Sequence, residues 1–99
     1  MNGSLPEIGV EANGSKGRYV LRSPRGEVAE LTFTRVGDHQ IIIDHTEVPE
    51  AFRGQGAGLL LVTRAVDDAR KAGKKIIPLC PFANAQFHRH PEWTDVRKT

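Results

Sequence analysis

The stretch that decides the fold is His45-Thr46-Glu47-Val48-Pro49-Glu50-Ala51-Phe52-Arg53-Gly54-Gln55-Gly56-Ala57-Gly58. It follows residues 40–44, an Ile-rich segment that predicts a strand, and precedes residues 59–72, whose apolar positions repeat at helical spacing. The first backbone N–H groups of a helix have no partner within the helix and carry partial positive charge. Glycines let an anion approach these groups closely, and no Ser, Thr, Asp or Asn stands just before Leu59 to cap them. The sequence therefore predicts an anion site, and a phosphate beside Arg53 fits it well.

Two common phosphate-binding turns do not match this stretch. A P-loop requires Lys and Ser or Thr after its last glycine, whereas Gly58 is followed by two leucines. A dinucleotide-binding turn requires Gly-x-Gly-x-x-Gly and an acidic residue at the end of the next strand. The glycines here are spaced Gly-x-Gly-x-Gly, and the next predicted strand, residues 75–79, ends at Cys80. Both of these classes are excluded.

A third pattern matches the turn. Residues 53–58 resemble the Arg-x-x-Gly-x-Gly loop that binds the acyl-CoA pyrophosphate in the GNAT superfamily of N-acetyltransferases. Three further motifs, at residues 45–49, 78–82 and 90–93, are similar to a branch of very small, single-domain GNAT-like proteins of unknown substrate. The resemblance spans residues 17–96, nearly the whole chain.

The order of predicted elements gives an α+β fold. We expect a flexible tail over residues 1–16, with residues 8–12 touching the sheet edge, because this segment is rich in Gly, Asn and Ser. The remaining predicted elements are three antiparallel strands, a helix, a parallel strand and a short helix, at residues 18–22, 27–36, 40–48, 59–72, 75–79 and 83–90. Pro78 predicts that the parallel strand lies at a sheet edge, and Leu59, Val62, Val66 and Ala69 form the predicted apolar stripe of the long helix. The resemblance implies the same fold without its usual N-terminal helices, in one domain over residues 17–96, with the acceptor side left open.

Composition excludes several classes of function. A chain of 99 residues with 38% hydrophobic and 26% charged residues is expected to form one globular domain. A net charge of +2 does not favour nucleic acid or a membrane surface as partner. The single cysteine excludes an internal disulfide, and residues 1–6 lack the pattern of a signal peptide. We expect a cytoplasmic protein that is a monomer or weak dimer.

Acetyl transfer to an amine needs a base for the amine proton and a group that protonates the leaving thiolate. Glu47 and His45 alternate with Thr46, so they share one face of the strand, and each is a candidate base; the alternative for Glu47 is an ordinary surface carboxylate. Cys80 is a candidate nucleophile or proton donor, and its alternative is a small, inert, buried residue. His88 is the remaining candidate acid, because Gln86 stands where many relatives carry Tyr.

The resemblance also implies a set of cofactor-binding residues. It places the pantetheine arm in a gap between residues 47–48 and 79–80, with the Val48 N–H polarising the acetyl carbonyl. The implied contacts to acetyl-CoA come from Val48, Arg53, Gly54, Gln55, Gly56, Ala57, Gly58, Asn84 and Phe87. His88 and His90 lack an acidic or Cys ligand at metal spacing, so no metal is expected.

The leading hypothesis is an acetyl-CoA-dependent N-acetyltransferase acting on a primary amine, either a protein lysine, a peptide terminus or an unidentified amine. The alternative is a non-catalytic acyl-CoA-binding sensor or interaction module. A third hypothesis confines the chemistry to the thiol of Cys80, which would then have a low pKa.

Overall fold

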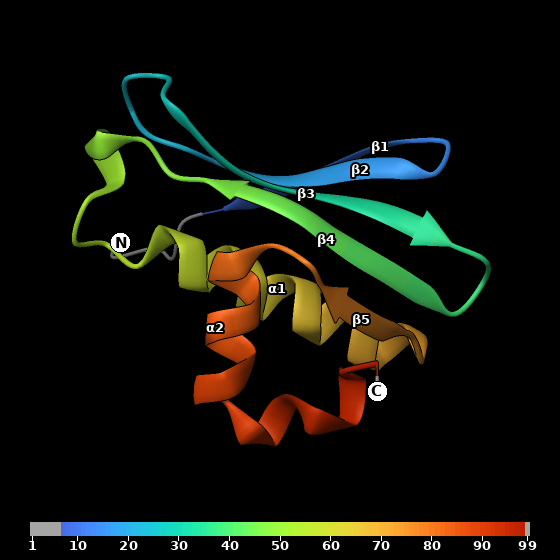
Figure 1. Ribbon diagram of the computed structural model, residues 1–99. Coiled ribbons are helices and arrows are strands. Elements are labelled where there is room, and N and C mark those ends of the chain that lie inside the picture. The colour runs from blue at the N-terminus through green and yellow to red at the C-terminus, as the bar shows by residue number, and fades with distance from the viewer. Residues whose placement is uncertain (1–6, 99) are drawn as a thin grey trace.

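The computed structural model describes residues 7–98, which form one five-stranded sheet with helices packed against it (Figure 1). The strands lie in the order β1-β2-β3-β4-β5. Their bounds are Ile8–Asn13, Lys16–Arg22, Val28–Val36, Gln40–Glu47 and Lys75–Pro78. The first four are antiparallel neighbours, and β5 runs parallel to β4. The helices are α1 (Ala57–Ala72) and α2 (Pro81–Arg89), with short 3-10 segments η1 (Glu50–Phe52) and η2 (Pro91–Val96).

The α+β prediction is confirmed, but the sheet has four antiparallel strands where the sequence predicted three. Residues 8–13 form β1, the edge strand, and pair with β2 along their whole length. The expected contact of residues 8–12 with the sheet edge is confirmed, and their assignment to a flexible tail is wrong. Ile8 packs against the core, and this burial outweighs the weak strand propensity of the Gly- and Asn-rich segment. The folded unit therefore includes residues before position 17, and the part of the predicted tail at residues 1–6 lies outside the described residues.

One face of the sheet and the inner face of α1 make the core. The strands contribute large side chains such as Leu31, Ile43 and Ile76, each with no exposed surface. The residues of α1 that are buried are Ala57, Gly58, Leu61, Val62, Ala65, Val66 and Ala69. The helix begins at Ala57, two residues before the predicted start, and the prediction that Leu59 belongs to the buried stripe is wrong. Leu59 lies in the first turn and is 37% exposed.

The end of β4 is bent by a bulge. Thr32 is opposite His45 and Phe33 is opposite Ile43, so Asp44 has no partner on β3 and the register shifts by one residue. The pairing of β4 with β5 ends at Ile43 and Pro78. Beyond this point the two strands separate, and the Cys80 N–H still donates to the Ile43 carbonyl at 3.1 Å. Among the described residues, the last part of β4 therefore has no paired strand on its β5 side.

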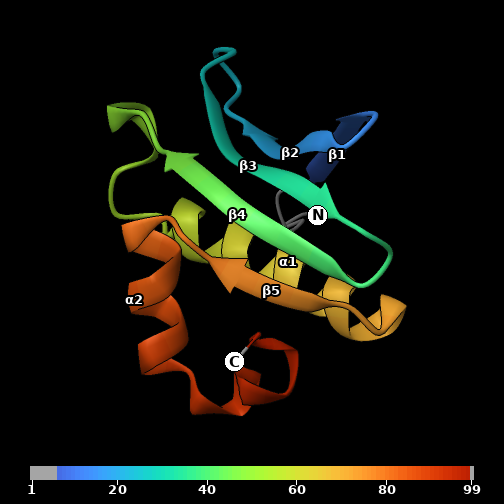
Figure 2. The ribbon, with the colours of Figure 1, turned by 45° about the vertical axis from the view of Figure 1, so that its right-hand side comes forward.

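The predicted edge position of Pro78 is confirmed, since β5 is the last strand of the sheet (Figure 2). The chain after η2 covers part of this edge, where the Lys98 N–H donates to the Ile76 carbonyl at 2.8 Å. Within residues 7–98, no helix is long and apolar enough to cross a membrane.

Candidate functional site

The glycine-rich turn leads directly into α1. Gly54 and Gly56 have φ values of 77° and 68°, which a residue with a Cβ adopts only with strain. Gly56 is the N-cap residue of α1, and no side chain caps the helix. The first turn also has no acidic residue. The helix therefore begins with unfilled backbone donors and uncompensated partial positive charge, as the sequence predicts.

A pocket of about 350 Å³ lies at this helix start. One side consists of Arg53, Gly54, Gly56, Ala57 and Gly58, and Val48 at the end of β4 joins them. The opposite side comes from α2, through Phe82, Gln86 and Arg89. Phe82 packs so closely on Gly58 that a Cβ there would lie 2.7 Å from its Cζ atom. A side chain at position 58 would therefore displace the ring of Phe82.

The residues of α2 that face the pocket are not those expected from the resemblance. Phe82, Gln86 and Arg89 are spaced four and three residues apart and so share one helix face. Asn84 lies on another face, where its carbonyl oxygen accepts a hydrogen bond from Arg97 at 2.8 Å. Phe87 is buried, with its ring 5.3 Å from that of Trp93. The helical spacing of residues 82, 86 and 89 in the sequence indicates that these three side chains share a face of α2. The sequence does not indicate whether this face or the face of Asn84 lines the pocket, because that depends on what α2 packs against.

Two guanidinium groups flank the pocket. The Arg53 side chain is 83% exposed and pairs with Glu50 at 3.1 Å. The exposed Arg89 approaches from the other wall. Gln55 does not line this pocket; its amide donates to the Ala51 carbonyl at 3.2 Å. Two arginines around an uncapped helix start form an arrangement suited to an anionic ligand such as a pyrophosphate.

Cys80 lies where β4 and β5 separate. It is 4% exposed, and its Sγ atom lies 3.4 Å from the Thr46 hydroxyl. Burial raises the pKa of the thiol, but the Thr46 hydroxyl and the backbone N–H groups of Phe82 and Ala83 at the start of α2 lower it by more, so the net pKa is below its ordinary value. The thiol thus lies where β4 and β5 separate, and it gives up its proton more readily than an ordinary cysteine.

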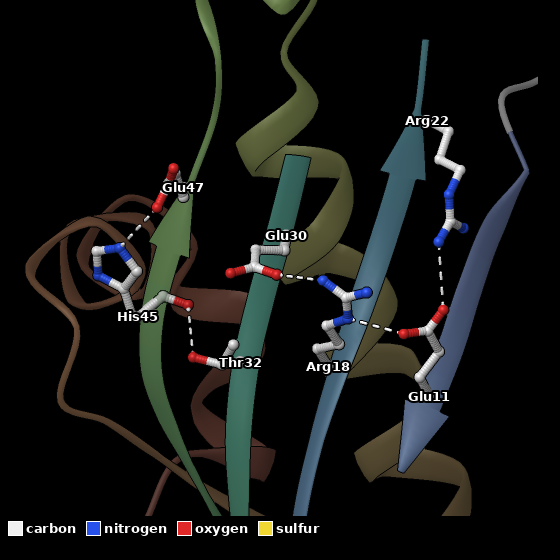
Figure 3. A network of polar contacts seen from close by, with 7 residues as sticks. All are labelled: Glu11, Arg18, Arg22, Glu30, Thr32, His45 and Glu47. Atoms are coloured by element: carbon white, nitrogen blue, oxygen red, sulfur yellow. Dashed lines mark hydrogen bonds and ion pairs between the residues drawn. The ribbon is translucent and has the colours of Figure 1, made fainter. Parts of the chain in front are cut away.

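The two candidate bases lie on the other side of β4. The ring of His45 and the carboxylate of Glu47 are 3.7 Å apart, and both are well exposed. Figure 3 shows them beside Glu30, Thr32, Arg18 and Glu11, on the face of the sheet opposite α1. The bulge at Asp44 sets this arrangement: Thr46 contacts Cys80, while His45 and Glu47 point the opposite way.

The remaining histidines are apart from this group. His88 is exposed on α2, and no polar contact of its side chain is present among the described residues. His90 stacks on Trp93 with ring centroids 4.2 Å apart, and its Nδ1 lies 2.9 Å from Glu92. This contact agrees with a structural role for His90. Among residues 7–98, no three His, Cys, Asp or Glu side chains are grouped as metal ligands.

These features, a splayed and bulged strand followed by a glycine turn and an uncapped helix, agree with an N-acetyltransferase fold. Residues 18–96 match the family model for the GCN5-related N-acetyl-transferases. The solution NMR structure of a GCN5-like protein from Staphylococcus aureus is similar, with a TM-score of 0.69 and 30% sequence identity over 91% of this chain and 87% of that chain. A comparison with curated proteins gives no match.

The chain belongs to the GCN5-related N-acetyltransferase family. Members of this family generally use acetyl-CoA as cosubstrate and an amine as acceptor.

Proposed function

We propose that this chain binds acetyl-CoA at the glycine turn and transfers the acetyl group to a primary amine in the cytoplasm, with a protein lysine or a peptide terminus as the favoured acceptor. The observation that carries the proposal is the uncapped start of α1 inside a pocket between Arg53 and Arg89. Backbone donors of residues 56–59 and the two guanidinium groups would hold the pyrophosphate. The rigid turn then fixes the direction in which the rest of the ligand leaves the pocket.

The free side of β4 supports the next step. Because pairing with β5 stops at Ile43, backbone groups of Thr46 to Val48 are available to bond a pantetheine arm. The Val48 N–H is the candidate donor to the acetyl carbonyl, where it would stabilise negative charge as the amine attacks. The position of Val48 supports this role, because Val48 lines the same pocket as the glycine turn.

The two proton transfers of the reaction are assigned to residues on opposite sides of β4. Glu47, with His45 beside it, accepts the proton of the attacking amine, directly or through water. The Cys80 thiol gives its proton to the departing CoA thiolate, a role favoured by its lowered pKa and its position at the opening. The open face around Glu47 suits a large acceptor such as a polypeptide, since the side chains of Glu47 and His45 are well exposed and the helices α1 and α2 lie on the other side of the sheet (Figure 1).

The test is an assay of acetyl transfer from acetyl-CoA to a panel of lysine peptides, free N-terminal peptides and small amines. The release of CoA and the mass of the acetylated product are the two readouts. Glu47→Gln should reduce transfer while acetyl-CoA binding persists, and the matched exposed variant Glu7→Gln should leave both unchanged. Full transfer by both Glu47→Gln and His45→Gln would overturn the assignment of the base. Tight acetyl-CoA binding without transfer to any amine would instead favour the non-catalytic module.

A further inference from the structure

A second hollow lies on the other side of the segment that carries the glycine turn. Its volume is about 540 Å³, larger than that of the pocket at the turn. One wall comes from the β2–β3 turn, residues 22–27, and the other from Ala51, Phe52 and Gln55. We refer to it as the hairpin pocket. Phe52 lines both pockets.

The floor of the hairpin pocket is apolar and belongs to the core. Leu21 is 3% exposed and Phe52 is 4% exposed. Pro24 and Ala51 extend this apolar surface towards the opening. An apolar group placed against these side chains is removed from water at little structural cost, because the side chains are already fixed in the core.

The rim of the hairpin pocket carries two guanidinium groups. Arg22 pairs with Glu11 at 3.3 Å, so its charge is partly balanced. Arg25 is exposed, and its side chain has no polar partner among residues 7–98. The acidic lining residue is Glu27, whose carboxylate is engaged with the Ser23 hydroxyl. Arg25 is therefore a cation of this rim without an ion-pair partner among residues 7–98, and its guanidinium is free to donate hydrogen bonds to an anionic group.

The β2–β3 turn is preformed. The Ser23 N–H donates to the Glu27 carbonyl at 2.9 Å, and the Gly26 N–H donates to the Ser23 carbonyl at 3.0 Å. Gly26 provides the positive φ of 93° that this closure requires. Arg25 is consequently presented from a hydrogen-bonded loop, which reduces the entropy lost when a ligand binds.

We propose that the hairpin pocket is a second ligand site, separate from the CoA pocket, that takes a small amphipathic carboxylate. The apolar body of the ligand packs on Leu21 and Phe52, and its carboxylate pairs with the Arg25 guanidinium. The proposal does not depend on acetyl-CoA binding, since none of its polar contacts involves residues 53–58.

The test uses the full chain without CoA and follows the backbone amides by NMR during titration with 3-phenylpropionate. We expect saturable shifts confined to residues 21–27 and 51–55. The neutral analogue 3-phenylpropanamide should bind about fivefold more weakly, as expected for loss of one exposed ion pair. Arg25→Ala should abolish the preference for the acid, whereas Lys71→Ala, which removes a distant exposed charge, should retain it.

Three results would overturn the proposal. These are shifts that do not saturate, equal affinity for the acid and the amide in the unmodified protein, and an unchanged preference in Arg25→Ala. Because each readout is made without CoA, a failure here leaves the acetyltransferase proposal intact, and a failure of CoA binding leaves this one intact.

Discussion

The Thr46 hydroxyl and the Cys80 thiol lie 3.4 Å apart and connect β4 to the start of α2 at the point where β4 and β5 separate. These residues are 34 positions apart in the sequence. Their contact depends on the bulge at Asp44, because without that extra residue Thr46 would face the other side of the sheet. The bulge therefore determines which side chain of β4 meets the thiol.

Replacing Thr46 with Val should raise the pKa of the Cys80 thiol. The hydrogen bond from the Thr46 hydroxyl lowers the pKa of the thiol, whereas burial of the thiol raises it. Removal of the hydroxyl therefore leaves the effect of burial less opposed. The measurement is the pH dependence of thiolate ultraviolet absorbance in the two proteins. Thr32→Val is the control, because Thr32 bonds the His45 carbonyl and does not contact the thiol. Identical titrations in Thr46→Val and the unmodified protein would contradict this role for Thr46.

Gly58→Ala should weaken acetyl-CoA binding with little change in stability. Alanine gains about 1 kcal/mol in helix propensity over glycine, which offsets part of the roughly 1–3 kcal/mol cost of overpacking. The ring of Phe82 is partly exposed and can swing away from the new Cβ, but it then moves within the ligand pocket. Thermal melting and an acetyl-CoA titration separate the two effects.

The double variant Gly58→Ala with Phe82→Leu supplies the control for this prediction. A shorter side chain at position 82 relieves the contact and should restore part of the affinity. Equal affinity in Gly58→Ala and the unmodified protein would mean that Phe82 does not border the bound ligand.

Arg89→Ala should reduce CoA affinity about fivefold or more, with the loss becoming smaller as salt is raised. Arg89 lines the pocket opposite the turn, so its charge acts on the phosphates. Lys71→Ala is the matched control, because Lys71 lies in the last turn of α1, about 20 Å from the helix start. An equal loss in both variants, measured by calorimetry at two salt concentrations, would point to net charge rather than to a contact of Arg89.

Tyr19→Phe should lower the free energy of unfolding by about 1–2 kcal/mol near neutral pH. The buried Tyr19 hydroxyl donates to Asp68 on α1 at 2.9 Å, and its loss leaves that carboxylate with Arg64 alone. Burial first, and then the Asp68 hydrogen bond, raises the pKa of Tyr19 above its ordinary value of 10.0. The neutral form is thus favoured in the folded state, and this stabilisation is present below pH 10 and is lost as pH rises above it.

Urea unfolding from neutral to alkaline pH tests this prediction. The unmodified protein should lose stability above pH 10 more steeply than Tyr19→Phe, whose side chain does not ionise. Parallel curves for the two proteins would contradict the raised pKa.

Local chemistry was sufficient to predict the glycine turn, an uncapped helix after it and the parallel edge strand, although α1 begins two residues before the predicted start. The glycine spacing, the missing cap and Pro78 each act through backbone geometry, which a single sequence reveals. By contrast, β1 was predicted as a tail because its pairing with β2 depends on burial of Ile8 by elements far along the chain.

The arrangement of the candidate site was only partly predictable for the same reason. Cys80 and Glu47 were singled out by type and by spacing, but their placement on opposite sides of β4 follows from the bulge at Asp44, which has no local sequence signal. The face of α2 that lines the pocket depends on packing of Phe87 against Trp93, a tertiary contact.

The most direct test of the central claim is thermal unfolding with acetyl-CoA, CoA, ATP and NAD, each at matched concentration. A ligand at ~100 times its dissociation constant adds roughly 2.7 kcal/mol, which in a domain of this size should raise the melting temperature by about ten degrees. The account predicts this rise with acetyl-CoA and CoA and not with ATP or NAD. An unchanged melting temperature with CoA, at concentrations where CoA-binding proteins respond, would contradict the proposed CoA site. The glycine turn would then be only the start of a helix.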